Sequence, residues 1–229
     1  MKKALLILSI LFISMSYGQE VKQVPQINVS GEGKVKVIPD QATITVTVET
    51  KGNNAKEVKK QNDEKIDAVL KFIKKMNVAP SDYKTQRVSL NPQYDYEKKK
   101  HNYNATQTIE ILLRDLSKYD ELMEGLVDQG INRIDAVTFQ SSKLAQYQSE
   151  ARKLAMKEAK IKAEDYVSVL GQKVGRAMTI SDNSQTYYPQ PVYATMKSME
   201  SSDTAQPRET LAAGEINITA NVTVSFILE

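Results

Sequence analysis

Apolar and polar residues alternate with a period of two in several parts of the chain, which is typical of half-buried β-strands. Two such stretches lie at positions 27–37 and 42–48, separated by the turn residues Pro39 and Asp40. In the last such stretch, at 215–228, every second residue is apolar. We expect one face of each strand to pack and the other to face water.

A period near 3.6 predicts three helices elsewhere in the chain. The first follows the capping candidates Asn53 and Asn54 and ends near Asn77. The second covers 116–126, and the third extends from about 144 to 170. At 1.5 Å per residue the third helix is roughly 40 Å long, enough to cross a whole sheet. Its alanine-rich face predicts a close approach to strands.

The remaining patterned segments are strands. A long hairpin is predicted from strands at 83–96 and 103–114, joined by a polar tip at 97–102, and shorter strands are predicted at 134–140 and 173–180. Together these elements predict an α+β fold. Antiparallel strands pack against three helices, the long third helix crosses the sheet, and the C-terminal strand closes the fold.

Residues 1–18 have the pattern of a secretory signal peptide. Two lysines precede an apolar run at positions 4–13, and small residues stand just before the expected cleavage point. We therefore expect a mature domain at 19–229 that is exported to the periplasm or cell envelope of a bacterium. No later apolar segment is long enough to predict a transmembrane span in the mature chain.

Composition excludes several classes of protein. Loss of the leader leaves 29 basic residues against 28 acidic ones, which is not the charge of a nucleic-acid-binding protein. The chain has no cysteine and one histidine, so disulfides and most transition-metal or Cys/His catalysis are excluded. We predict no cofactor and no catalytic residue.

Positions 181–210 lose all periodicity and predict a mobile loop. The segment contains Met196 and Met199, whose thioethers are soft ligands for Cu(I), although two thioethers without His or Cys make a weak metal site. It also contains a Tyr- and Pro-rich stretch at 187–193, and such extended segments can bind a partner.

Other polar groups have simpler explanations than catalysis. His101 would have to serve a Ser-His-Asp triad from a hairpin tip, where nothing fixes its position. The lysines at 98–100 could contact anionic lipid or phosphate, but a solvated tip explains them better. Three carboxylates share the first helix with lysines, as on a solvated helix face: Asp63, Glu64 and Asp67.

Gly31 and Gly33 begin like a dinucleotide-binding fingerprint, but strand periodicity follows them where a helix would have to start. We interpret the two glycines as a turn or bulge between strand segments.

The order of several motifs resembles the SIMPL-domain family. The motifs include Val-Ser-Gly-Glu-Gly at 29–33 before Pro39-Asp40, Arg-Asp-Leu-Ser-Lys at 114–118, and Gly-Glu-Ile at 214–216. That family includes bacterial periplasmic immunogenic proteins and proteins linked to oxidative-stress defence. The resemblance implies an exported, self-associating α+β protein and supplies no catalytic residues.

Three hypotheses about function follow. The first is a non-enzymatic envelope or periplasmic protein that acts through self-assembly as a homo-oligomer or by binding an envelope protein partner, with protection under oxidative stress implied only by the resemblance. The second is a ligand or copper-binding carrier. The third is an enzyme of unidentified type.

Overall fold

A computed structural model describes residues 24–97, 99–184 and 211–229. The described residues form three α-helices, two short 3-10 helices and seven strands, which confirms the α+β fold class. In chain order the elements are β1 (Gln26–Val37), β2 (Gln41–Gly52), α2 (Ala55–Lys75), η1 (Pro80–Asp82), β3 (Tyr83–Asp95), β4 (Lys100–Leu113), η2 (Leu116–Lys118), α3 (Tyr119–Asp128), β5 (Arg133–Gln140), α4 (Leu144–Ser168), β6 (Val174–Asp182) and β7 (Ile216–Leu228).

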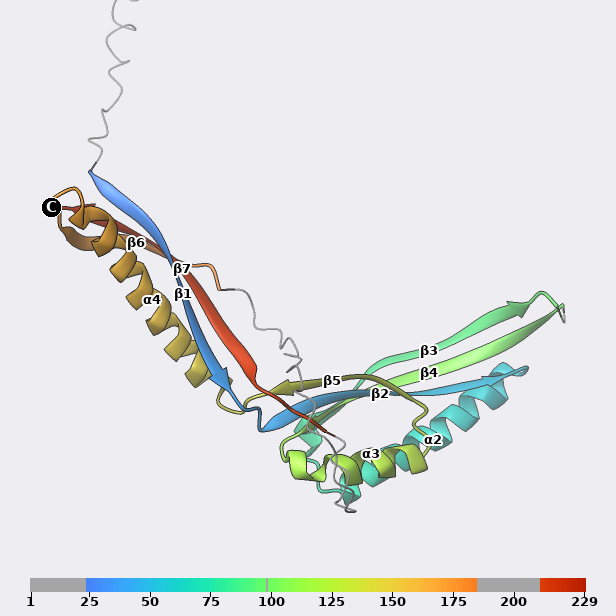
Figure 1. Ribbon diagram of the computed structural model, residues 1–229. Coiled ribbons are helices and arrows are strands. Elements are labelled where there is room, and N and C mark those ends of the chain that lie inside the picture. The colour runs from blue at the N-terminus through green and yellow to red at the C-terminus, as the bar shows by residue number, and fades with distance from the viewer. Residues whose placement is uncertain (1–23, 98, 185–210) are drawn as a thin grey trace, which may run out of the picture.

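The strands form two separate antiparallel sheets, which lie in two elongated lobes arranged as a V (Figure 1). The first lobe consists of the sheet β1-β7-β6 and helix α4. The second lobe consists of the sheet β3-β4-β2-β5 with helices α2 and α3 on one face. The main contacts between elements all lie within one lobe or the other.

The second lobe has an apolar core between its sheet and its two helices. α2 begins at Asn54, whose side-chain oxygen accepts hydrogen bonds from the N–H groups of Lys56 and Glu57, as expected of an N-cap. The core is built from alternate residues of β2 and β4 and from one stripe of each helix. Its fully buried members include Ile44, Val46, Val48, Val69, Ile73, Ile109, Ile111, Leu122 and Leu126.

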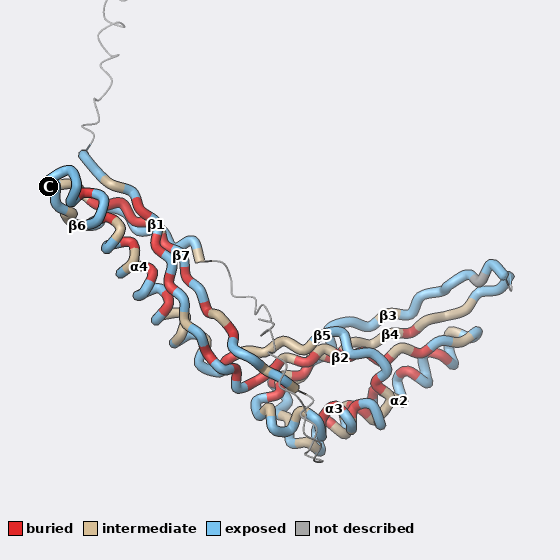
Figure 2. Tube along the Cα trace, in the orientation of Figure 1, coloured by how far each residue is buried: buried red, intermediate tan, exposed pale blue. Residues whose placement is uncertain are grey.

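The first lobe is built on an unusually close contact between α4 and β1. The buried face of α4 is a row of alanines at every fourth position, Ala151 to Ala163, and Figure 2 shows this face turned toward β1 and β7. A Cβ atom on Gly31 would lie 2.0 Å from the carbonyl oxygen of Ala155, and one on Gly33 would lie 1.9 Å from that of Ala151. The predicted close approach of this helix to strands is confirmed.

The same contact explains why two glycines occur in β1. The interpretation of Gly31 and Gly33 as a turn or bulge is wrong, because β1 pairs with β7 in unbroken register from Gln26 to Val37. Glycine is required at these positions because the backbone of α4 occupies the space of a side chain.

The chain passes between the lobes at two places in the described residues, from β1 to β2 and from β5 to α4. The two crossings are joined by Asp40, whose carboxylate accepts hydrogen bonds from the N–H and hydroxyl groups of Ser142 at 2.7 and 2.5 Å. Phe139 packs against both cores. These contacts fix the junction without forming a shared core.

The predicted hairpin is present, but its second strand begins earlier than expected, at Lys100 and not at Tyr103. β3 and β4 pair as far as Asp95 and Lys100, so much of the segment predicted as a polar tip belongs to β4. The start of the segment predicted as a mobile loop, Ser181 and Asp182, belongs to β6. Asn183 and Ser184 are described too, and residues 185–210, which make up the remainder of that segment, lie outside the described residues.

A two-pronged ion pair fastens the start of β3 to the end of β4. Arg114 Nε donates to Asp82 Oδ2 at 2.6 Å, and Arg114 Nη2 donates to Oδ1 at 2.8 Å. The Asp82 residue is only 9% exposed. Hydrogen bonding by Arg114, which outweighs the opposing effect of burial, lowers the pKa of Asp82 below its usual range.

We expect Asp82→Asn to destabilise the protein at neutral pH and to have much less effect in acid. A carboxyl whose folded-state pKa is lowered stabilises the fold above its unfolded pKa of about 3.9, and this stabilisation is lost as the pH falls through the folded value. Urea unfolding between pH 7 and about pH 3 tests this, with Arg114→Lys as an intermediate case that keeps the charge. A stability difference that stays constant with pH would contradict it.

Candidate functional site

Hydroxyl and carboxylate groups form a chain on the open face of the second lobe's sheet, opposite the helices. Thr47 of β2 has no exposed surface, and its hydroxyl donates to Asp135 Oδ2 at 2.5 Å. Because that bond uses the only hydroxyl proton of Thr47, the Thr108 hydroxyl, 2.8 Å away, must donate to Thr47 Oγ1. The hydrogen bonds are therefore ordered from Thr108 through Thr47 to Asp135.

A β-bulge brings Asp135 to Thr47. β5 pairs with β2 through Ala136 opposite Thr45 and through Ile134 opposite Val46, so Asp135 is an extra residue. Bulges commonly redirect a side chain in this way. The sequence pattern does not reveal this group of side chains, because alternation shows neither the register of two strands nor a bulge in one of them.

Glu49 lies near this chain and is surrounded by donors. Lys51 Nζ is 2.9 Å from Glu49 Oε1, Asn104 Nδ2 donates to Oε1 at 2.8 Å, and Arg133 Nη1 is 3.6 Å from Oε2. The hydrogen bond from Lys51, opposed by partial burial, lowers the pKa of Glu49 and keeps it ionised. Arg133 also pairs with Asp135 at 2.7 Å.

The charged side chains of this polar cluster are paired with one another. A general acid or base needs a pKa near the working pH and a free direction toward a substrate. Glu49 already accepts its bonds from cationic and amide donors, and Thr47, which Asp135 could activate, has no exposed surface. The cluster therefore neutralises and orders the open face of the sheet and presents no catalytic arrangement.

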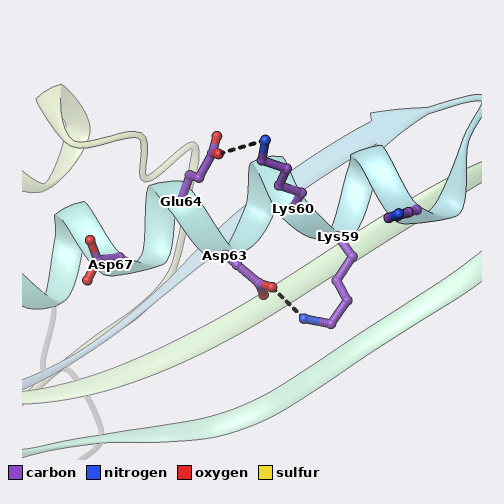
Figure 3. A pocket seen from close by; sticks show the side chains of 6 residues that line it. Lys59, Lys60, Asp63, Glu64 and Asp67 are labelled. Atoms are coloured by element: carbon purple, nitrogen blue, oxygen red, sulfur yellow. Dashed lines mark hydrogen bonds and ion pairs between the residues drawn. The ribbon is translucent and has the colours of Figure 1, made fainter.

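A shallow depression on α2 gathers the carboxylates that the sequence places on one helix. Figure 3 shows Lys59 pointing to Asp63 on one side of the helix and Lys60 pointing to Glu64 on the other. The third carboxylate, Asp67, pairs with Lys71 at 2.7 Å. All three pairs join residues four apart on an exposed face, which is the solvated arrangement that the sequence predicts.

His101 lies on the hairpin, where the sequence places it. Its ring contacts that of Tyr94 across the two strands, with centroids 5.0 Å apart and the planes inclined by 61°. This contact places the histidine beside the Tyr94 ring, on the sheet face opposite the one that carries Thr108 and Asn104.

The candidate copper ligands Met196 and Met199 lie outside the described residues, as does the Tyr- and Pro-rich segment 187–193. The copper site and the partner-binding segment therefore stay predictions. In the part of the chain that the structure describes, no three His, Cys, Asp or Glu side chains gather as a metal site would require. No described helix is long and apolar enough to span a membrane.

The order of the motifs along the chain agrees with comparisons with known proteins. The model of the SIMPL family, described as a protein of unknown function (DUF541), matches residues 27–226. This chain therefore belongs to the SIMPL family, as the resemblance in its motifs implies.

Curated relatives cover most of the chain. The uncharacterized protein YggE of Escherichia coli K12 is 30% identical over 213 residues, which are 92% of this chain and 86% of the relative. YggE of Edwardsiella ictaluri is 27% identical over 83% of this chain and 82% of its own. The 26 kDa periplasmic immunogenic protein of Brucella melitensis is 27% identical over 91% of this chain and 86% of its own.

Proposed function

We propose that this protein is exported to the periplasm or cell envelope and acts there through self-association or by binding an envelope protein, without catalysing a reaction. The observation that carries the proposal is the exposed apolar surface at the end of α4. Tyr166 lies in the last turn of α4, and Val169 and Leu170 follow its last residue; the three residues are 63%, 86% and 71% exposed.

Two further observations support export and a role in the envelope. The N-terminal residues 1–18 have the pattern of a signal peptide, and the Brucella relative is named as a periplasmic protein. Protection under oxidative stress enters this proposal from the family resemblance alone.

The edges of both sheets are poorly suited to strand addition, which favours association through side-chain faces. At the outer edge of β1, Glu158 accepts a hydrogen bond from the N–H of Glu32, and Lys162 donates to the carbonyl of Ser30 at 3.2 Å. Side chains of α4 thus occupy backbone groups that a new strand would need.

The other edge strands are irregular. β5 contains the bulge at Asp135, β3 contains a register shift beside Gln86 and a proline at Pro92, and β6 pairs with two register shifts. Bulges and edge prolines are the devices by which proteins prevent sheets from joining edge to edge. Association is therefore expected at the exposed apolar residues at the end of α4.

Size-exclusion chromatography with light scattering on the chain beginning at Gln19 tests this proposal. We expect a mass that is a multiple of the monomer, and we expect Val169→Ser with Leu170→Ser to shift the protein toward the monomer. Leu154→Ser with Ile161→Ser is the matched control, since it removes two exposed apolar side chains elsewhere on α4. A monomer at all concentrations up to about 100 µM, well above the range of typical specific contacts, would overturn self-association.

A further inference from the structure

The end of the β3–β4 hairpin is a two-stranded ribbon that projects beyond the rest of the second lobe. β2 ends at Gly52, opposite Tyr103 of β4, and the next described helix begins only at Ala55. Beyond that point β3 and β4 pair with each other alone as far as Asp95 and Lys100 (Figure 1). We call the residues 93–97 and 99–102 the ribbon.

The ribbon has an aromatic face. The ring of Tyr94 lies 5.0 Å from that of Tyr96, nearly perpendicular to it, and 5.0 Å from that of His101. Tyr96 is 84% exposed and Tyr94 is 45% exposed. Because side chains alternate along a strand, this face continues at Leu90 and Val88, which are also exposed.

The opposite face of the ribbon is polar. Gln93 pairs with Asn102 in the register of the two strands, and both side chains alternate with the aromatic ones. The ribbon is therefore amphipathic although neither face is covered by a helix. Contacts between rings across the two strands stabilise such a ribbon, but they leave Tyr96 84% exposed, so this face stays open to a partner.

Basic residues stand at the end of the hairpin, where Lys100, next to His101 in β4, lies on the polar face. Lys99 lies in the turn with φ of 45°, and Lys100 begins β4; both are exposed. Asp95 and Glu97 are acidic residues of the same segment. The end of the hairpin thus combines tyrosine rings with two exposed lysines.

We propose that the ribbon binds the surface of a bilayer that contains anionic phospholipids. Tyrosine is enriched at membrane interfaces because its ring is apolar and its hydroxyl stays hydrated. Lysine extends its apolar stem along the interface and keeps its charge at the headgroups, where anionic lipids attract it.

The shape of the ribbon also fits a flat surface. A convex projection cannot surround a small ligand, whereas a bilayer surface that meets the end of the hairpin can contact the tyrosine rings, Lys99 in the turn and Lys100 on the opposite face. Neither helix of the lobe extends as far as the end of the hairpin, so neither obstructs the approach (Figure 1). This binding is independent of the self-association proposed above.

Vesicle flotation of the chain beginning at Gln19 tests the proposal, because this chain keeps every described element and lacks the apolar leader, which would bind lipid by itself. We expect binding to vesicles of phosphatidylglycerol and phosphatidylethanolamine, and binding about tenfold weaker to phosphatidylcholine vesicles or at 0.5 M salt. Tyr94→Ser with Tyr96→Ser should weaken binding to both kinds of vesicle about tenfold.

The lysines should act differently from the tyrosines. Lys99→Gln with Lys100→Gln should weaken binding about tenfold on anionic vesicles and leave the residual binding to phosphatidylcholine unchanged. Lys153→Gln with Lys157→Gln, which removes two exposed lysines from α4, is the matched control and should bind like the parent.

The outcomes separate this proposal from self-association. Loss of flotation in the ribbon variants, with an unchanged mass by light scattering, supports lipid binding at the ribbon. Absence of flotation in the parent, equal binding by parent and ribbon variants, or an equal loss in the α4 control would overturn it. A simultaneous loss of flotation and of oligomer mass would also overturn it, since the ribbon would then be a contact between copies.

Discussion

Gly31→Ala together with Gly33→Ala should unfold the first lobe or destabilise it by more than about 3 kcal/mol, the upper end of typical overpacking costs. An alanine Cβ at either position would lie 2.0 Å or less from a carbonyl oxygen of α4. The helix would have to move away from β1, and its contact with the sheet would be lost. Equilibrium urea unfolding followed by circular dichroism measures the effect.

Whether these glycine substitutions lower or raise the stability of the protein tests the close contact between α4 and β1. In the interior of an ordinary strand, replacing glycine by alanine stabilises, because glycine loses more backbone entropy on folding. Lys34→Ala, at an exposed position of the same strand, serves as the control and should change stability by no more than about 0.5 kcal/mol. Stabilisation by the glycine substitutions would show that α4 does not approach β1 as closely as the structure has it.

The sequence predicts where the helices and strands lie better than it predicts which strands pair. Alternation identifies β1, β2 and β7, and the alanine row of α4 predicts a close contact with strands. Alternation specifies which residues share a face, but it carries no information on which strands pair. The division into two sheets is therefore absent from the pattern, although Pro39 and Asp40 mark the place where it occurs.

The polar cluster shows the same limit at the level of side chains. Thr47 and Thr108 look like ordinary outward-facing threonines in the sequence, and only the pairing of β2 with β4 puts them in contact. Asp135 reaches Thr47 through a bulge, which is a property of two strands together. By contrast, the carboxylates of α2 could be assigned correctly because helical spacing alone brings them beside lysines.

The separation of the two cores has an energetic consequence. Buried apolar residues form one cluster in each lobe, and Phe139 is among the side chains that pack against both. Cooperative unfolding requires that the loss of one core remove contacts from the other. With the main contacts confined to each lobe, we expect the lobes to unfold in separate transitions.

Ile109→Ala should destabilise the second lobe by about 2–5 kcal/mol, the range for removing a large aliphatic side chain from a core. Ile109 has no exposed surface, lies opposite Val46 in the pairing of β2 with β4, and belongs to the core of that lobe. Ile134→Ala makes the same change at a position of β5 that is 52% exposed, and it should cost about 1 kcal/mol or less.

Hydrogen exchange shows which lobe each substitution affects. Ile109→Ala should increase exchange in β2, β4 and α2 and leave β1, β7 and α4 protected, whereas the double glycine substitution should do the reverse. Because the two sites share no core, their effects on stability should also add when all three substitutions are combined. Uniform loss of protection across both lobes from either change would contradict separate cores, and would mean that the junction at Asp40, Ser142 and Phe139 couples them strongly.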